Sequence, residues 1–387
     1  MTIATHEMKD HIIEALKTKR LIVCCGAGGV GKTTTSAALA LAGARLGKQV
    51  LALTIDPSKR LAQTLGVDRN TPTPVPLSRE RLSKLKVPPE GAVHAWLLDP
   101  KLISDQVVNE EAGEEASTLK ANLIYQQISS IVAGMQEYTA VEALHQFLKE
   151  NQYDLIILDT PPSRHTLRFI DSPERVASFL DKRIFRLFVP SQGSLLGKVA
   201  AKVIDEVLDR AFGEVTRKEL KQFFELFSRL LDHLNRNQAE MAKVFRSDDV
   251  LFYLITTARD DAVDEAQRFA HEVQRRQLTL GGFLINRCPQ HQNKQPDEVA
   301  LKKYFHELLQ DQLDSKDDLL SIEGLQELFQ EPIFATVQTE KLRLNTIKKL
   351  HQLGEVSLLN ELNVEGSSLE GISELAQQIL QSRVSQY

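Results

Sequence analysis

One stretch near the start of the chain, residues 21–56, restricts the possible folds more than any other. It opens with LIVCC (21–25), continues with the alanine-rich TTTSAALALAGARLG (33–47), and ends with QVLALTID (49–56). Apolar runs without alternation are typical of strands that are buried on both faces of a parallel sheet. The alanine-rich segment favours a helix, which Gly47 would terminate. The stretch therefore predicts a strand–loop–helix–strand crossover.

Similar apolar runs recur along the rest of the chain, with helical patterns between them. They are AVHAWLLD (92–99), DLIILD (154–159), VLFYLITTA (250–258), LGGFLINR (280–287) and PIFATV (332–337). Such alternation predicts an α/β fold with a doubly wound, mostly parallel sheet. Ligands of these folds bind outside the carboxyl ends of the strands.

Two long helical stretches, about 100–150 and 165–247, interrupt this alternation and predict an inserted helical subdomain. The sheet domain is expected to span 1–350, and 351–387 to form a C-terminal tail with one short helix. Apolar residues share one face of that helix, which is expected to pack on its own domain or on a partner: Leu369, Ile372, Leu375, Ala376 and Ile379.

Composition excludes several classes of protein. The 387 residues carry a net charge of −5, so a broad nucleic-acid surface is not expected. The first 20 residues show no targeting pattern and no run is long enough to span a membrane, which favours a cytoplasmic protein. The three cysteines, Cys24, Cys25 and Cys288, form no Cys-x-x-Cys pair, so we expect buried thiols and no zinc site.

The sequence GAGGVGKT (26–33) matches the pattern G-x-x-x-x-G-K-[ST], which we call the phosphate loop. Its position between a predicted strand and a predicted helix supports the match. Glycines let backbone N–H groups surround phosphates, the lysine reaches the β- and γ-phosphates, and the threonine hydroxyl binds Mg²⁺. The motif predicts ATP and Mg²⁺ as ligands. The expected nucleotide contacts are Gly26, Gly28, Gly29, Val30, Gly31, Lys32, Thr33 and Thr34, with Lys32 also catalytic.

Two aspartates follow predicted strands at the same edge of the sheet. Asp56 is expected to be catalytic, because it is placed to orient or deprotonate the attacking water, and it is also expected to contact the metal. An Asp before a Pro, however, also starts many helices. Asp159 is placed to hold Mg²⁺ through a water molecule. The cations that follow, His165 and Arg168, fit a nucleotide contact and an exposed helix start equally well.

The phosphate loop resembles the deviant loops of the MinD, ParA, nitrogenase iron protein and ArsA group. With TIDPSKRLAQTLG (54–66), DTPPSRHTLRFID (159–171) and NLIYQQISSIVAGMQEYTAVEAL (122–144), the chain resembles the ArsA family, which includes arsenical-pump ATPases and tail-anchored-protein targeting ATPases. The resemblance implies that Asp56 positions water, that Asp159 lies on the magnesium side, and that Asn286 and the stretch from Pro332 bind the adenine base. It also implies a nucleotide-dependent homodimer or heterodimer, with an apolar-helix client or a membrane-protein partner.

The chain departs from this family at several positions. Ala27 stands where the deviant loops carry a lysine that reaches the partner's nucleotide, and Arg164 and Lys59 are the cations whose positions suggest a substitute. The zinc-binding Cys-x-x-Cys clasp of the targeting ATPases and the cysteine cluster of the arsenite-stimulated pumps are both missing from the sequence.

Three other functions remain open from the sequence. A ParA/MinD-like positioning ATPase needs a basic patch or tail, and a small-molecule kinase needs an acceptor pocket. A weakly hydrolysing nucleotide-binding adaptor is compatible with Ala27.

Nine phenylalanines between 169 and 245 fit either the subdomain's own core or a groove for an apolar helix.

Overall fold

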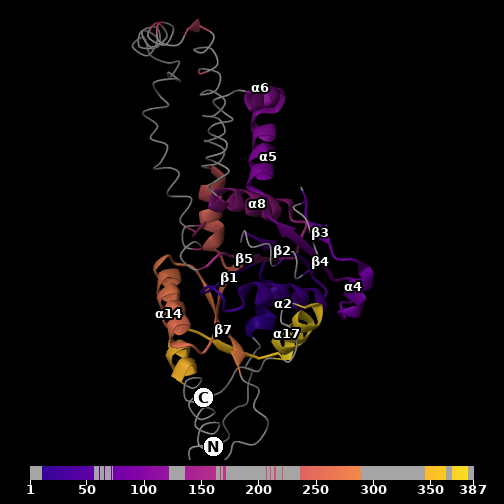
Figure 1. The fold of residues 1–387 in the computed structure, drawn as a ribbon, viewed down its shortest axis with the longest axis vertical. Coiled ribbons are helices and arrows are strands. Elements are labelled where there is room, and N and C mark those ends of the chain that lie inside the picture. The colour runs from indigo at the N-terminus through magenta and orange to yellow at the C-terminus, as the bar shows by residue number, and fades with distance from the viewer. Residues whose placement is uncertain are drawn as a thin grey trace, which may run out of the picture.

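The structure, a computed structural model, describes residues 11–55, 71–121 except 72, 136–162, 236–288, 345–362 and 368–381, with single residues between these ranges. Within them, eight strands form one sheet in the order β3-β4-β2-β5-β1-β6-β7-β8 (Figure 1). Every neighbouring pair is parallel except β3–β4. The strands are β1 Leu21–Cys25, β2 Gln49–Thr54, β3 Val75–Pro76, β4 Ala92–Leu97, β5 Leu155–Asp159, β6 Val250–Thr256, β7 Leu280–Cys288 and β8 Val356–Asn360. This confirms the predicted α/β class.

Helices cover both faces of the sheet, because alternate side chains of each buried strand point to opposite sides. One core contains residues of α1 (His11–Thr18), α2 (Lys32–Arg45), α4 (Arg79–Lys84) and α17 (Leu369–Gln381). The other contains residues of α5 (Pro100–Ala112), α8 (Gln136–Glu150) and α14 (Asp260–Arg275). The short η1 (Gly113–Glu115) and α6 (Ala116–Ala121) follow α5, which extends away from the sheet (Figure 1).

Helix α2 lies against the sheet on one side and against α17 on the other (Figure 1). Its small side chains allow this close approach: a Cβ on Gly43 would lie 2.9 Å from the Leu155 side chain. Arg45 joins the two helices, since its guanidinium donates to the Ser373 carbonyl at 3.1 Å and to the Ser373 hydroxyl at 2.6 Å. Ile372, Leu375, Ala376 and Ile379 are buried in the same core, which confirms that the final helix packs on its own domain.

The structure also differs from the sequence expectation. Residues 356–360 form the edge strand β8 beside β7, although this segment is expected to be part of a tail. Residues 75–76, inside the proline-rich segment TPTPVPLSRE (71–80), which is expected to be a connector, form the short antiparallel strand β3. Helix α8 belongs to the predicted helical stretch 100–150, yet Ala140, Val141 and Leu144 are buried in the core of the sheet. The expected strand 332–337 and most of 165–235 lie outside the described residues.

Two of the nine phenylalanines between 169 and 245 are described. Phe169 and Phe245 are 0% and 1% exposed, and their ring centroids lie 5.5 Å apart. Both therefore belong to the chain's own core. None of the described helices is long and apolar enough to cross a lipid bilayer.

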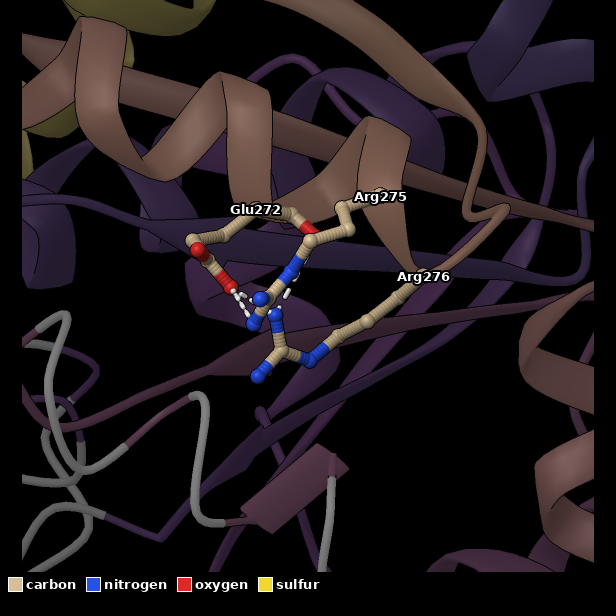
Figure 2. Close-up of polar contacts among 3 residues, drawn as sticks. All are labelled: Glu272, Arg275 and Arg276. Carbon is tan, nitrogen blue, oxygen red and sulfur yellow. Dashed lines mark hydrogen bonds and ion pairs between the residues drawn. The ribbon is translucent and has the colours of Figure 1, made fainter.

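Helix α14 ends in a charged cluster that two arginines form around one glutamate (Figure 2). Glu272 accepts from Arg275 at 2.7 Å and also pairs with Arg276 one turn later. The hydrogen bond from Arg276 is the main reason that the pKa of Glu272 lies below its ordinary value. Cations near a helix C-terminus are also favoured by the helix dipole.

We expect the Glu272→Gln variant to lose on the order of 1 kcal/mol or less of unfolding free energy near neutral pH, because the cluster is partly exposed to solvent. A depressed folded-state pKa stabilises the fold above the ordinary glutamate pKa of 4.5. The difference in unfolding free energy between the variant and wild type should therefore disappear as the pH falls through the folded-state pKa of Glu272. Urea unfolding across this range measures it, with exposed Glu110→Gln as the control. A difference that persists in acid would contradict this account.

Candidate functional site

The phosphate loop follows the carboxyl end of β1, which lies between β5 and β6 in the middle of the sheet. At two glycines of the loop, neighbouring atoms leave no room for a side chain. A Cβ on Gly26 would lie 2.1 Å from the Ile255 carbonyl oxygen, and a Cβ on Gly31 would lie 2.2 Å from the Asn286 amide nitrogen. Gly31 also has a φ of 92° and caps α2. No atom lies within 4 Å of a Cβ built on Gly28 or Gly29, so this side of the loop has room for a ligand.

Lys32, the first residue of α2, folds back over the loop. Its ammonium donates to the Ala27 carbonyl oxygen at 2.6 Å, and the side chain is only 7% exposed. The ammonium therefore lies over the same concave backbone whose N–H groups and helix N-terminus favour anions. Ala27, the position where related loops carry a lysine, is partly buried and packs against the core that contains α2. Thr34, the next predicted contact after Thr33, is partly exposed on the first turn of α2.

The carboxylate of Asp159 lies at the end of β5 and is 0% exposed. Its Oδ2 accepts from the Thr33 hydroxyl at 3.0 Å and from the Thr54 hydroxyl at 3.2 Å, and its Oδ1 accepts from Ser36 at 3.3 Å. The structure thus brings together the predicted metal residues Thr33 and Asp159. Oxygen donors of this kind suit Mg²⁺, and the Thr33 oxygen keeps lone pairs for a metal while its proton faces Asp159.

Two further threonines, which the sequence analysis missed, attach the segment after β5 to β1. The Thr160 hydroxyl donates to the Cys24 carbonyl oxygen at 2.7 Å. The Thr166 hydroxyl lies 2.9 Å from the Thr160 hydroxyl and 2.8 Å from the Pro161 carbonyl oxygen. Both threonines are 0% exposed. Thr160 has a sequence signal, since it directly follows the strand-end Asp159, whereas Thr166 has none.

Asn286, near the end of β7, lies next to the phosphate loop although β6 separates β7 from β1. Its amide donates to the Val30 carbonyl oxygen at 3.0 Å and accepts from the Arg287 N–H at 2.9 Å. The residue is 8% exposed.

Several predicted site residues lie outside the described residues. They are Asp56, Lys59, Arg164, His165, Arg168 and Pro332. Among the residues that the structure does describe, no three His, Cys, Asp or Glu side chains are grouped as metal ligands.

The adjacent cysteines of β1 belong to different cores. Cys24 lies in the core with α2, and Cys25 lies in the core with α8 and α14. Adjacent strand residues point to opposite faces, so these two thiols share no ligand position. Burial raises the pKa of Cys24 to about 12 and raises that of Cys25 further.

We expect the native protein at about pH 8 to react very slowly with a thiol reagent such as dithionitrobenzoate, because the thiolate is the reactive form. All three cysteines are buried, so the reagent should detect three thiols only after denaturation. The absorbance of the released thiolate measures this, with a denatured sample as the reference. Rapid labelling of one thiol in the folded protein would contradict the described packing of β1.

Comparison with known proteins places this site in a family. A sequence model described as "Anion-transporting ATPase" matches residues 19–354. An ATPase get3 of Schizosaccharomyces pombe is 23% identical over 316 residues, which cover 78% of this chain and 85% of that protein. An ATPase get3 of Aspergillus terreus is 30% identical over 183 residues, covering 47% and 52%. An ATPase GET3 of Ajellomyces dermatitidis is 28% identical over 200 residues, covering 50% and 56%.

The matched region contains the phosphate loop, Asp159 and Asn286, and it extends over seven of the eight described strands. The chain therefore belongs to the anion-transporting ATPase family, and it is an ATPase.

Proposed function

We propose that this chain is a Mg²⁺-dependent, ATP-hydrolysing switch whose nucleotide state controls binding of a client or a membrane protein. The observation that carries the proposal is the convergence of Lys32, Thr33 and Asp159 at the carboxyl end of β1. The Lys32 ammonium lies over the loop, and the Thr33 hydroxyl and the Asp159 carboxylate are hydrogen-bonded beside it. Phosphates at this position would meet an ammonium, backbone N–H groups and a helix N-terminus.

Each group has a distinct role in the proposed mechanism. Lys32 would bind the β- and γ-phosphates, and the backbone from Gly26 to Gly31 would surround them. Thr33 and Asp159 would hold Mg²⁺, which offsets phosphate charge when bound. Asp56 would orient the attacking water as a general base.

The hydroxyl contacts of Asp159 support a coupling between the nucleotide and the segments that follow β2 and β5. Thr54, which precedes Asp56 by two residues, shares Oδ2 of Asp159 with Thr33. A change at the metal position would therefore alter the hydrogen bond of Thr54 at the end of β2, where the segment with Asp56 begins. On the other side, Thr160 ties the segment after β5 to the end of β1.

The proposed client is an apolar helix. Support comes from the resemblance to tail-anchored-protein targeting ATPases and from the relatives named ATPase get3, and it favours an apolar helix as client. The protein would act in the cytoplasm, as a nucleotide-dependent homodimer or a heterodimer with a related ATPase. One observation favours a second candidate, the weakly hydrolysing adaptor: the residue at position 27 is an alanine, so the chain lacks the lysine contact between subunits.

We expect Asp159→Asn to lower the rate of Mg-ATP hydrolysis by about 100-fold or more, because the neutral amide cannot support the metal and its charge. Asp154→Asn is a matched control, since Asp154 lies immediately before β5, at the end of the strand opposite to Asp159. There its carboxylate accepts a hydrogen bond from the Gln49 N–H at 2.8 Å. Phosphate release at saturating Mg-ATP measures the rate, with chelation of Mg²⁺ as a second arm. Equal rates in wild type and Asp159→Asn, or a rate indifferent to chelation, would contradict the proposed metal site.

We expect mass by light scattering to show a dimer that forms or tightens with a non-hydrolysable Mg-ATP analogue, and not with Mg-ADP. Lys32→Ala, which removes the phosphate contact, should abolish the change. A mass indifferent to nucleotide would contradict the two-subunit switch, and with slow turnover it would favour the adaptor.

A further inference from the structure

The amide of Asn286 has one orientation that satisfies both of its neighbours. The Val30 carbonyl only accepts hydrogen bonds and the Arg287 N–H only donates. The side-chain nitrogen therefore faces Val30, at 3.0 Å, and the side-chain oxygen faces Arg287, at 2.9 Å. With Asn286 at 8% and Val30 at 3% exposure, water has little access to replace either bond.

The same amide also packs against the next loop residue. A Cβ on Gly31 would lie 2.2 Å from the amide nitrogen, and Gly31 is the left-handed residue at which the loop becomes α2. Asn286 therefore touches two consecutive residues of the loop, one through a hydrogen bond and one through steric contact. These contacts hold the loop immediately before the two residues that would bind phosphate and metal, Lys32 and Thr33.

The backbone around Asn286 is specialised for this contact. Arg287 has a φ of 56°, which is uncommon for a residue with a side chain, and the β7–β8 ladder is irregular between Ile285 and Cys288. Cys288 restores the ladder, since its carbonyl accepts from the Glu361 N–H at 2.6 Å. Such local strain persists where the surrounding structure holds it in place, and it is concentrated at functional sites.

We propose that Asn286 is a positioning residue of the phosphate loop, and that it supports the phosphate-binding shape of the loop even for a ligand that has no base. This inference rests on the proposed function, in which the loop binds nucleotide phosphates. It adds to the role that the family resemblance implies, which is recognition of adenine.

The physical reason is preorganisation. Without the amide, the buried Val30 carbonyl has lost its donor and the loop samples other conformations. The apparent dissociation constant then rises as the fraction of competent loop falls. Loss of one buried hydrogen bond corresponds to a weakening of roughly 5- to 100-fold. The weakening should extend to a ligand without a base, because the contact with the loop does not involve the base.

The test is calorimetric titration of the full chain with three ligands: Mg-ADP, Mg-inosine diphosphate and magnesium pyrophosphate. Inosine lacks the 6-amino group of adenine, and pyrophosphate lacks a base. The variants are Asn286→Asp and Asn286→Ala, with Asn360→Asp as the control, because Asn360 is an exposed asparagine at the end of the neighbouring strand β8. We expect both Asn286 variants to weaken binding of all three ligands, including magnesium pyrophosphate, and the control to bind like wild type.

A second readout separates positioning from a general loss of structure. The carboxyl that Asn286→Asp introduces repels the Val30 carbonyl when ionised, but donates a hydrogen bond to it when protonated. Burial raises the pKa of such a group. Relative to wild type at the same pH, the affinity of Asn286→Asp should therefore recover as the pH is lowered from about 7.5 to about 5.5. Asn286→Ala has no proton to supply and should show no recovery. Thermal melting of each variant checks that it is folded.

Two results would overturn the inference. In the first, the variants change the ratio of Mg-ADP to Mg-inosine diphosphate affinity and leave pyrophosphate binding unchanged, which would mean that Asn286 recognises the base. In the second, both folded variants bind all three ligands like wild type. If wild type itself bound none of the ligands, the proposed function would fail, and the inference with it.

Discussion

The carboxylate of Asp159 is the contact on which the arrangement of the site depends. It is fully buried and accepts hydrogen bonds from the hydroxyl groups of two residues on α2 and one residue on β2. A buried carboxylate is costly unless hydrogen bonds replace the lost water. These hydroxyls satisfy it, and in doing so they fix the rotation of α2 relative to β5 and β2. The direction in which the phosphate loop leaves β1 follows from this packing.

Much of the fold could be predicted from local patterns. The central strands are continuous apolar runs because helices cover both of their faces, and the phosphate loop identified the first crossover. The edge strands gave weaker signals. β8 has one exposed and one partly exposed position, and β3 has only two residues. Neither strand contains an apolar run long enough to distinguish it from a loop in the sequence.

The contacts inside the site were less predictable, because they depend on strand order and register. Asp159 and Lys32 could be named from motifs. That Thr54 would reach Asp159 follows from the pairing of β2 with β5, in which these two residues are opposite one another. Asn286 could be placed at a strand end, but its contact with Val30 requires β7 to lie two strands from β1, and the sequence does not state that order.

The packing of α17 on α2 has a consequence for biosynthesis. Arg45 of α2 and its hydrogen-bond partner Ser373 are 328 positions apart in sequence. A nascent chain therefore exposes the outer face of the helix that begins with Lys32 and Thr33 until almost all of the described sequence has left the ribosome. Contacts between such distant segments form late in folding, and uncovered apolar surface invites aggregation. This ATPase is thus expected to complete the packing around α2 only after the segment with α17 has been synthesised, and to depend on protection of α2 before that point.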